Sequence, residues 1–138
     1  MNWTIYAGIS AVAAAATAIL AKIGIEGVPS TLATAIRTVV IVVFAWSIAF
    51  GLKEHHALTS ISRRSLSFLV LSGIATGVSW LAYFRALQLA PATRVAPIDK
   101  LSLPPTIILA AVFLGETMTW KLALGVGLMT IGAFLTLE

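Results

Sequence analysis

The sequence predicts an all-α integral membrane protein whose five transmembrane helices form one domain over residues 1–138. Apolar residues make up 59% of the chain and charged residues only 10%, and the mean hydropathy is +1.02. A water-soluble domain carries roughly a quarter charged residues. A chain of this length cannot hide so much apolar surface in one globular core. We therefore expect lipid to cover the remainder.

The first two helices are expected at residues 3–21 and 31–51. Each stretch reaches the about 20 mostly apolar residues that a membrane crossing needs. The first follows no basic leader, so it is interpreted as a retained helix rather than a secretory signal. Between the two, "KIGIEGVPS" interrupts the apolar pattern with Gly24, Gly27 and Pro29, and Ser30 is the expected cap of the next helix. Arg37 lies inside the second stretch.

The polar segment "KEHHALTSISRRS" predicts a connection to a third helix at residues 66–90, with Arg85 near its end. Pro91 ends that helix, because proline is tolerated at a helix start but not in a helix interior. The polar turn "ETMT" precedes the fifth helix, expected at residues 119–137 with Thr119 as its cap.

The fourth helix is expected at residues 92–114. Leu101 to Gly115 is apolar but too short to cross alone, whereas a start at Ala92 gives about 23 residues, enough for a slightly tilted crossing. "RVAPIDK" must then be helical, and Asp99 and Lys100 lie roughly 10–12 Å inside the helix start. The alternative is a solvated loop followed by a short re-entrant helix.

Hydroxyl and charged residues recur at helical spacing in three of the helices. They are Ser72, Thr76, Ser79 and Tyr83 in the third helix, Asp99, Ser102 and Thr106 in the fourth, and more weakly Tyr6, Ser10 and Thr17 in the first. A single hydroxyl in a membrane helix usually bonds its own backbone. Three such stripes in one small bundle favour a shared polar interior.

Four charged residues, Arg37, Arg85, Asp99 and Lys100, fall inside helices and nearer the same membrane side. Each costs several kcal/mol if it is buried without a partner. Two interpretations are open. The arginines reach the headgroups while Asp99 fixes the fold, or the four charges mark the mouth of a polar cavity. We favour the cavity, because Pro97 and the Pro104-Pro105 pair break a helix as transporters do where they bind cargo.

The predicted cavity residues are therefore Asp99, Lys100, Arg85, Arg37, Tyr83, Ser79, Ser102 and Trp80. Trp80 and Tyr83 are the weaker members, and core packing is the alternative role for Trp80. Small-residue spacing predicts close packing elsewhere: Gly73 and Gly77 on the third helix, and a close-packing or dimer-forming surface of Gly125, Gly127 and Gly132 on the fifth.

Other function classes find little support. The chain has no cysteine, which excludes disulfides, thiolate catalysis and cysteine-ligated metals. Its net charge of +4 is scattered, without the basic stripe of a nucleic-acid-binding protein. His55 and His56 lack H-E-x-x-H spacing, and Asp99 is the only aspartate. We therefore predict no enzyme activity, no metal site and no cofactor.

From "SWLAYFRALQLAPATRVAPIDKLS" through "AAVFLGETMTWKLALGVGLMTIGAFL" the chain resembles the EamA domain of the drug/metabolite transporter superfamily, as one five-helix repeat. The resemblance implies export or uptake of small metabolites by alternating access, with a cavity lined mainly by the first four helices. Most members of that family carry two such units in one chain, the second inverted, whereas this sequence has one. No residue role transfers by motif.

One unit encloses too little polar interior to seal a pathway, so we expect a homodimer in the cytoplasmic (inner) membrane of a prokaryote, with a small-molecule substrate and membrane lipid as its other partners. Five crossings put the termini on opposite sides. Basic residues are balanced between the sides, with Lys53, Arg63, Arg64 and Lys121 on one and Lys22, Arg37, Arg85, Arg94 and Lys100 on the other. Three of the second group lie inside the expected helices, and loop residues alone give four against two, which mildly favours a cytoplasmic N-terminus. The weak overall asymmetry favours an antiparallel dimer, with a parallel dimer as the alternative. The alternative function is a non-transporting membrane subunit that assembles with a partner protein.

Overall fold

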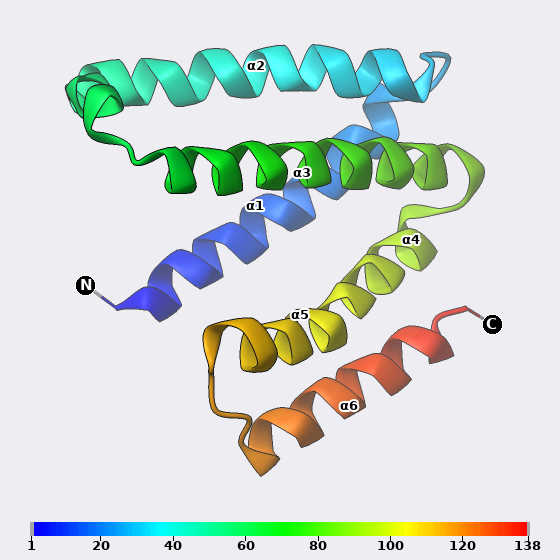
Figure 1. Cartoon of the computed structure of the whole chain (residues 1–138). Coiled ribbons are helices and arrows are strands. Elements are labelled where there is room, and N and C mark those ends of the chain that lie inside the picture. The colour runs from blue at the N-terminus through cyan, green and yellow to red at the C-terminus, as the bar shows by residue number, and fades with distance from the viewer. Residues whose placement is uncertain (1, 138) are drawn as a thin grey trace. The chain divides into compact units, whose positions relative to one another are not determined.

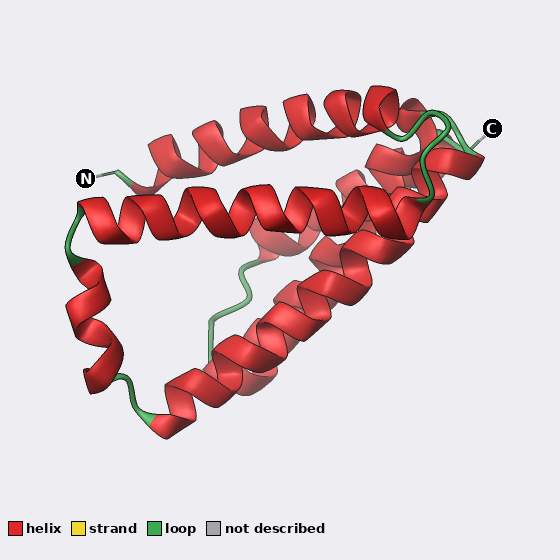
Figure 2. Ribbon diagram, turned by 90° about the horizontal axis from the view of Figure 1, so that it is seen from above, coloured by secondary structure: helices red, strands yellow, loops and turns green. Residues whose placement is uncertain are grey.

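The computed structural model describes residues 2–137, and every regular element in that range is a helix (Figures 1 and 2). This confirms the all-α fold class. The elements are α1 (Trp3–Gly24), α2 (Ser30–Gly51), η1 (Glu54–Ser60), α3 (Arg63–Leu89), α4 (Ala92–Asp99), η2 (Lys100–Ser102), α5 (Leu103–Leu109), η3 (Ala110–Leu114) and α6 (Trp120–Leu135).

Four helical runs are long and apolar enough to cross a membrane: α1 and α2 with 22 residues each, α3 with 27, and Ala92–Leu114 with 23. The apolar α6 has 16 residues and ends before the expected residue 137. The chain divides into two compact units, Ala21–Gln88 and the segments on either side of it.

The central unit, Ala21–Gln88, holds the last turn of α1 with α2, η1 and α3. Its buried residues are Ala21, Ile25, Thr34, Phe84 and Leu87. They lie at the end of α1 and in the turn that follows it, at the start of α2 and at the end of α3. In Figure 2 α2 and α3 approach each other at this end and diverge toward the end where η1 joins them. The packed core of the unit is therefore confined to one end.

The turn between α1 and α2 explains why the predicted Ser30 cap is wrong. Gly27 adopts φ +72°, a left-handed conformation that glycine reaches without steric cost. Pro29 then occupies the capping position with φ −54° and ψ 134°, and it offers no side-chain cap. Ser30 is already the first helical residue, and its carbonyl accepts a hydrogen bond from the Thr34 hydroxyl at 2.9 Å.

The polar connection between α2 and α3 is shorter than expected. Lys53 takes a left-handed conformation with φ 60° and leads into the 3₁₀ helix η1. α3 begins at Arg63 rather than at residue 66. The hydroxyl of Ser62 accepts the backbone N–H of Ser65 at 3.0 Å, so it satisfies one of the donors left open at the start of a helix.

The other unit contains a helical run from Ala92 to Leu114 that changes type along its length. Arg94 to Asp99 lies in α4 rather than in a loop. The run continues through a 3₁₀ turn, the short α5 and a π-helical turn. Pro97, Pro104 and Pro105 lack backbone N–H groups, so they cannot bond the carbonyls of the residues four positions earlier. That loss accounts for the 3₁₀ turn at Lys100–Ser102.

α6 packs against α4, η2 and α5. Gly115, with φ +69°, ends the π-helical turn, and the chain then runs back to Thr119. The Thr119 hydroxyl accepts the backbone N–H of Leu122 at 3.2 Å, which confirms the predicted cap. Val95 and Ala133 are the buried apolar residues of this hairpin.

Candidate functional site

The polar groups of the central unit meet at its packed end, beginning with two hydrogen bonds that join distant segments. The Lys22 ammonium, near the end of α1, donates to the backbone carbonyl of Leu87. The Gln88 amide donates to the carbonyl of Val28 at 2.7 Å. Leu87 and Gln88 belong to the last turn of α3, where helix carbonyls lack intrahelical donors and favour a cation. These bonds fasten the α1–α2 turn to the end of α3.

Arg37 lies beside this junction between the α1–α2 turn and the end of α3. Its guanidinium carbon is 4.9 Å from the centroid of the Trp80 ring and 5.0 Å from that of Phe84. Residues four apart share one face of a helix, so α3 presents the two rings together. Both distances are within the range of a cation–π interaction. The Arg37 charge also interacts electrostatically with Tyr83.

Of the predicted cavity residues in this unit, the structure brings together Arg37, Trp80 and Tyr83. Trp80 thus packs against a charge. Ser79 and Arg85 are exposed on α3, and Arg85 donates to the Gln88 side-chain oxygen at 3.1 Å. The Arg37–Trp80 contact is the centre of the candidate site.

The remaining predicted residues lie in the other unit. The Lys100 ammonium and the Asp99 carboxylate are 3.2 Å apart, with their side chains 56% and 41% exposed. Ser102 follows in η2, and its carbonyl accepts the Thr106 hydroxyl at 2.7 Å. The ion pair of Asp99 and Lys100 therefore lies where the prolines of this helical run remove backbone hydrogen bonds.

Sequence reasoning missed three residues at the junction: Lys22, Phe84 and Gln88. Lys22 was assigned to a loop, although it lies in the last turn of α1. Phe84, only 2% exposed, lies four residues after Trp80, and that spacing was a usable signal. Gln88 carries no charge, and its partner is 60 residues away, so no local pattern pointed to it.

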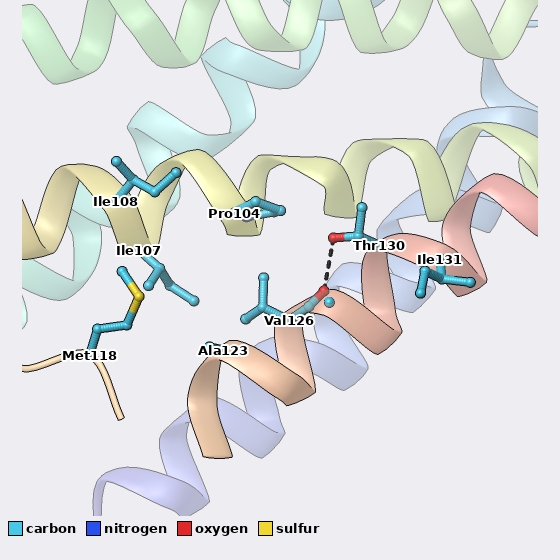
Figure 3. Close-up of a pocket in the computed structure, with 9 residues that line it drawn as sticks. Pro104, Ile107, Ile108, Met118, Ala123, Val126, Thr130 and Ile131 are labelled. Carbon is cyan, nitrogen blue, oxygen red and sulfur yellow. Dashed lines mark hydrogen bonds between the residues drawn. The ribbon is translucent and has the colours of Figure 1, made fainter. Parts of the chain in front are cut away.

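A groove runs between α5 and α6, as Figure 3 shows. Its volume is about 460 Å³. The lining residues are Pro104, Ile107, Ile108, Met118, Ala123, Val126, Gly127, Thr130 and Ile131. The Thr130 hydroxyl donates to its own helix, to the Val126 carbonyl at 2.8 Å. The groove thus offers an apolar surface without a charged group.

The chain matches the EamA-like transporter family over residues 1–138. It belongs to that family. A curated relative from Sinorhizobium sp., named "Uncharacterized transporter in cobO 3'region", is 46% identical over 134 residues, which cover 97% of this chain and 95% of the relative. No solved structure gives a significant match.

Membership confirms the resemblance seen in the sequence and makes the chain a multi-pass membrane protein of the transporter class. The family points to transport rather than catalysis. Among residues 2–137, no group of three or more His, Cys, Asp or Glu side chains is placed to hold a metal ion. His55 and His56 stack on each other in η1, with ring centroids 4.0 Å apart. The EamA-like relative consists of little more than the matched segment.

Proposed function

We propose that this EamA-like protein moves a small metabolite across the cytoplasmic membrane of a prokaryote by alternating access. The observation that carries the proposal is the family match over all 138 residues. The structure supports it with charged groups inside helical runs, where such groups are costly and usually mark a functional site. A second support is the proline-interrupted helix at Asp99 and Lys100. Such interruptions free backbone carbonyls for cargo or coupling ions.

In this proposal, Arg37, Trp80 and Tyr83 form one part of the pathway, and Asp99, Lys100 and Ser102 form another. Ser79 and Arg85 are exposed on α3, next in sequence to Trp80 and Phe84. The 3₁₀ turn at Lys100–Ser102 gives the fourth helical run a joint, since it interrupts the α-helical hydrogen bonding. Movement at this joint would change the access of solutes to the Asp99 carboxylate.

The transporting species is a homodimer in this proposal. Support comes from the relative, of which the matched segment makes up 95%, and from an open face of small residues on α6. Gly125 and Gly132 share this face, and a Cβ atom added to either meets no described heavy atom within 4 Å in its unit. Small residues allow close helix approach in membranes. The balanced basic residues favour an antiparallel arrangement, with a parallel dimer as the alternative.

Cysteine labelling tests the orientation, because the natural chain contains no cysteine. Asn2→Cys and Ser60→Cys are made separately and labelled in intact cells with a membrane-impermeant maleimide. Antiparallel insertion predicts partial labelling at each position, completed only after the membrane is opened. All-or-none labelling at each position rejects dual insertion and leaves the parallel dimer.

Flux measurements test transport itself. Purified protein is reconstituted into liposomes and assayed with radiolabelled amino acids, organic acids, organic cations and sugars. Saturable flux of any one class that is lost in protein-free vesicles supports a transporter. Absence of flux and binding across the whole panel favours the alternative, a non-transporting subunit that assembles with a partner membrane protein.

A further inference from the structure

The Arg37 guanidinium lies against two aromatic rings of α3. Trp80 and Phe84 lie 4.9 and 5.0 Å from its carbon atom. Within residues 2–137, Arg37 forms no ion pair, and no group accepts a hydrogen bond from its guanidinium. A guanidinium has five N–H donors, and ring stacking satisfies none of them. The described residues thus place a set of N–H donors beside two rings and provide no acceptor for them.

The depth of Arg37 makes an unused set of donors costly. Arg37 follows the first residue of α2 by seven positions, which places its backbone about 10 Å along the helix at 1.5 Å per residue. Its side chain is partly buried. An arginine within a membrane-spanning helix is stabilised by an acceptor, either a protein group, a ligand or a lipid headgroup.

The charged residues at this end of the central unit are mainly basic. Lys22 and Arg85 lie at the same end of the central unit, and Glu26 is the acidic residue of the intervening turn. Glu26 is exposed, and no ion pair links it to Arg37. Clustered positive charge of this kind attracts an anion.

We propose that Arg37 binds an oxyanion, a carboxylate or phosphate group of the transported solute, so that the substrate is an organic anion. This inference rests on the proposed transport function. The planar fork of a guanidinium matches the two oxygens of such a group and binds them through two parallel hydrogen bonds. Contact with Trp80 and Phe84 restricts the side chain before the anion arrives, which reduces the entropy lost on binding. A lipid phosphate presents the same chemistry, so the experiment must separate the two sources.

Thermal unfolding in a phosphate-free sugar detergent measures binding without assuming transport. The probes are inorganic phosphate, succinate and benzoate, compared with sodium chloride at equal ionic strength and with tetraphenylphosphonium as a cation. A ligand that binds the folded state raises the Tm in a concentration-dependent way. We expect at least one oxyanion to raise the Tm, with little effect from the cation.

Variants assign that effect to Arg37. Arg37→Gln should weaken the apparent Kd for the oxyanion by about tenfold or more, because a charge-assisted hydrogen-bonded contact is lost. Arg37→Lys, which keeps the charge but not the fork, should lie between Gln and wild type. Arg94→Gln, a matched change at an exposed arginine of α4, should bind as wild type does. The proposal is overturned if no oxyanion acts on the wild type, or if Arg37→Gln responds equally.

Two further measurements separate the remaining cases. If a short-chain phosphatidylglycerol raises the Tm through Arg37 and the soluble oxyanions do not, the bound group is a headgroup and the substrate assignment is wrong. Liposome flux tests the two proposals independently. If a cation or a sugar is transported and its flux is unchanged in Arg37→Gln, the transport function is supported and the proposed anionic substrate is wrong. If an oxyanion binds through Arg37 but no solute is transported, the binding site is supported and the transport function is wrong.

Discussion

Replacing Gln88 with methionine tests whether the hydrogen bond to Val28 holds the end of α3 to the α1–α2 turn. Methionine keeps the length and much of the shape of the side chain but cannot donate to the Val28 carbonyl, now bonded at 2.7 Å. It also loses the 3.1 Å contact with Arg85. We expect the packed end to remain formed but to be easier to open.

The two bonds differ in their expected contributions. The Arg85 contact is exposed and within one helix, so it contributes about 0.3 kcal/mol. The Val28 bond is partly buried, and leaving its carbonyl unsatisfied costs about 1–2 kcal/mol. Inter-helix hydrogen bonds in membrane proteins average about 0.6 kcal/mol and reach about 1.7. The sum predicts that Gln88→Met lowers the free energy of unfolding by about 1–2 kcal/mol.

Equilibrium unfolding in mixed micelles, followed by tryptophan fluorescence, measures this difference. Thr76→Val is the matched control, because the Thr76 hydroxyl bonds only its own helix, at the Ser72 carbonyl, and its loss should cost less than about 0.5 kcal/mol. Gln88→Glu separates the two bonds, since a carboxylate improves the Arg85 contact but cannot donate to Val28. If Gln88→Glu is as stable as wild type, or Thr76→Val costs as much as Gln88→Met, the reasoning is wrong.

Two further predictions concern the other unit. Asp99→Asn should reduce liposome flux by about tenfold or more, equivalent to about 1.4 kcal/mol. Membrane expression should stay normal, because the ion pair of Asp99 with Lys100 is exposed. Glu54→Gln is the control carboxylate, and equal flux in both variants argues against a role for Asp99. Thr119→Ala should lower the free energy of unfolding by about 1 kcal/mol through loss of the Leu122 cap, whereas an unchanged unfolding midpoint would show that α6 begins independently of it.

The helices were predictable because their signals are local. Length and hydropathy located all five apolar stretches, and Pro91 marked the end of α3 as expected. The expectation that Ser30 caps α2 failed because Pro29 adopts the capping backbone conformation itself. A short-range pattern of residue types cannot decide which of two adjacent residues takes that conformation.

The candidate site was predictable only in part, because its contacts join distant segments. Arg37 stood out as a charge inside an apolar helix, whereas Trp80 was a weaker candidate with core packing as its alternative role. That the two touch depends on how α2 packs against α3. Gly73 and Gly77 of α3 were predicted to pack closely, but a Cβ atom added to either meets no described heavy atom of their unit within 4 Å. Small-residue spacing identified a surface there but no partner.

The distribution of contacts in the central unit relates its stability to its proposed function. Lys22 and Gln88 bind backbone carbonyls at the end where Phe84 and Leu87 are buried, whereas the apolar residues of α2 and α3 nearer η1 are exposed. In lipid, apolar exposure carries little cost, because acyl chains replace the missing side chains. Polar contacts therefore decide which end stays closed. Arg37 lies at that closed end, so an alternating-access cycle that moves α2 relative to α3 would pivot around the residues proposed to bind the anion and would open first toward η1.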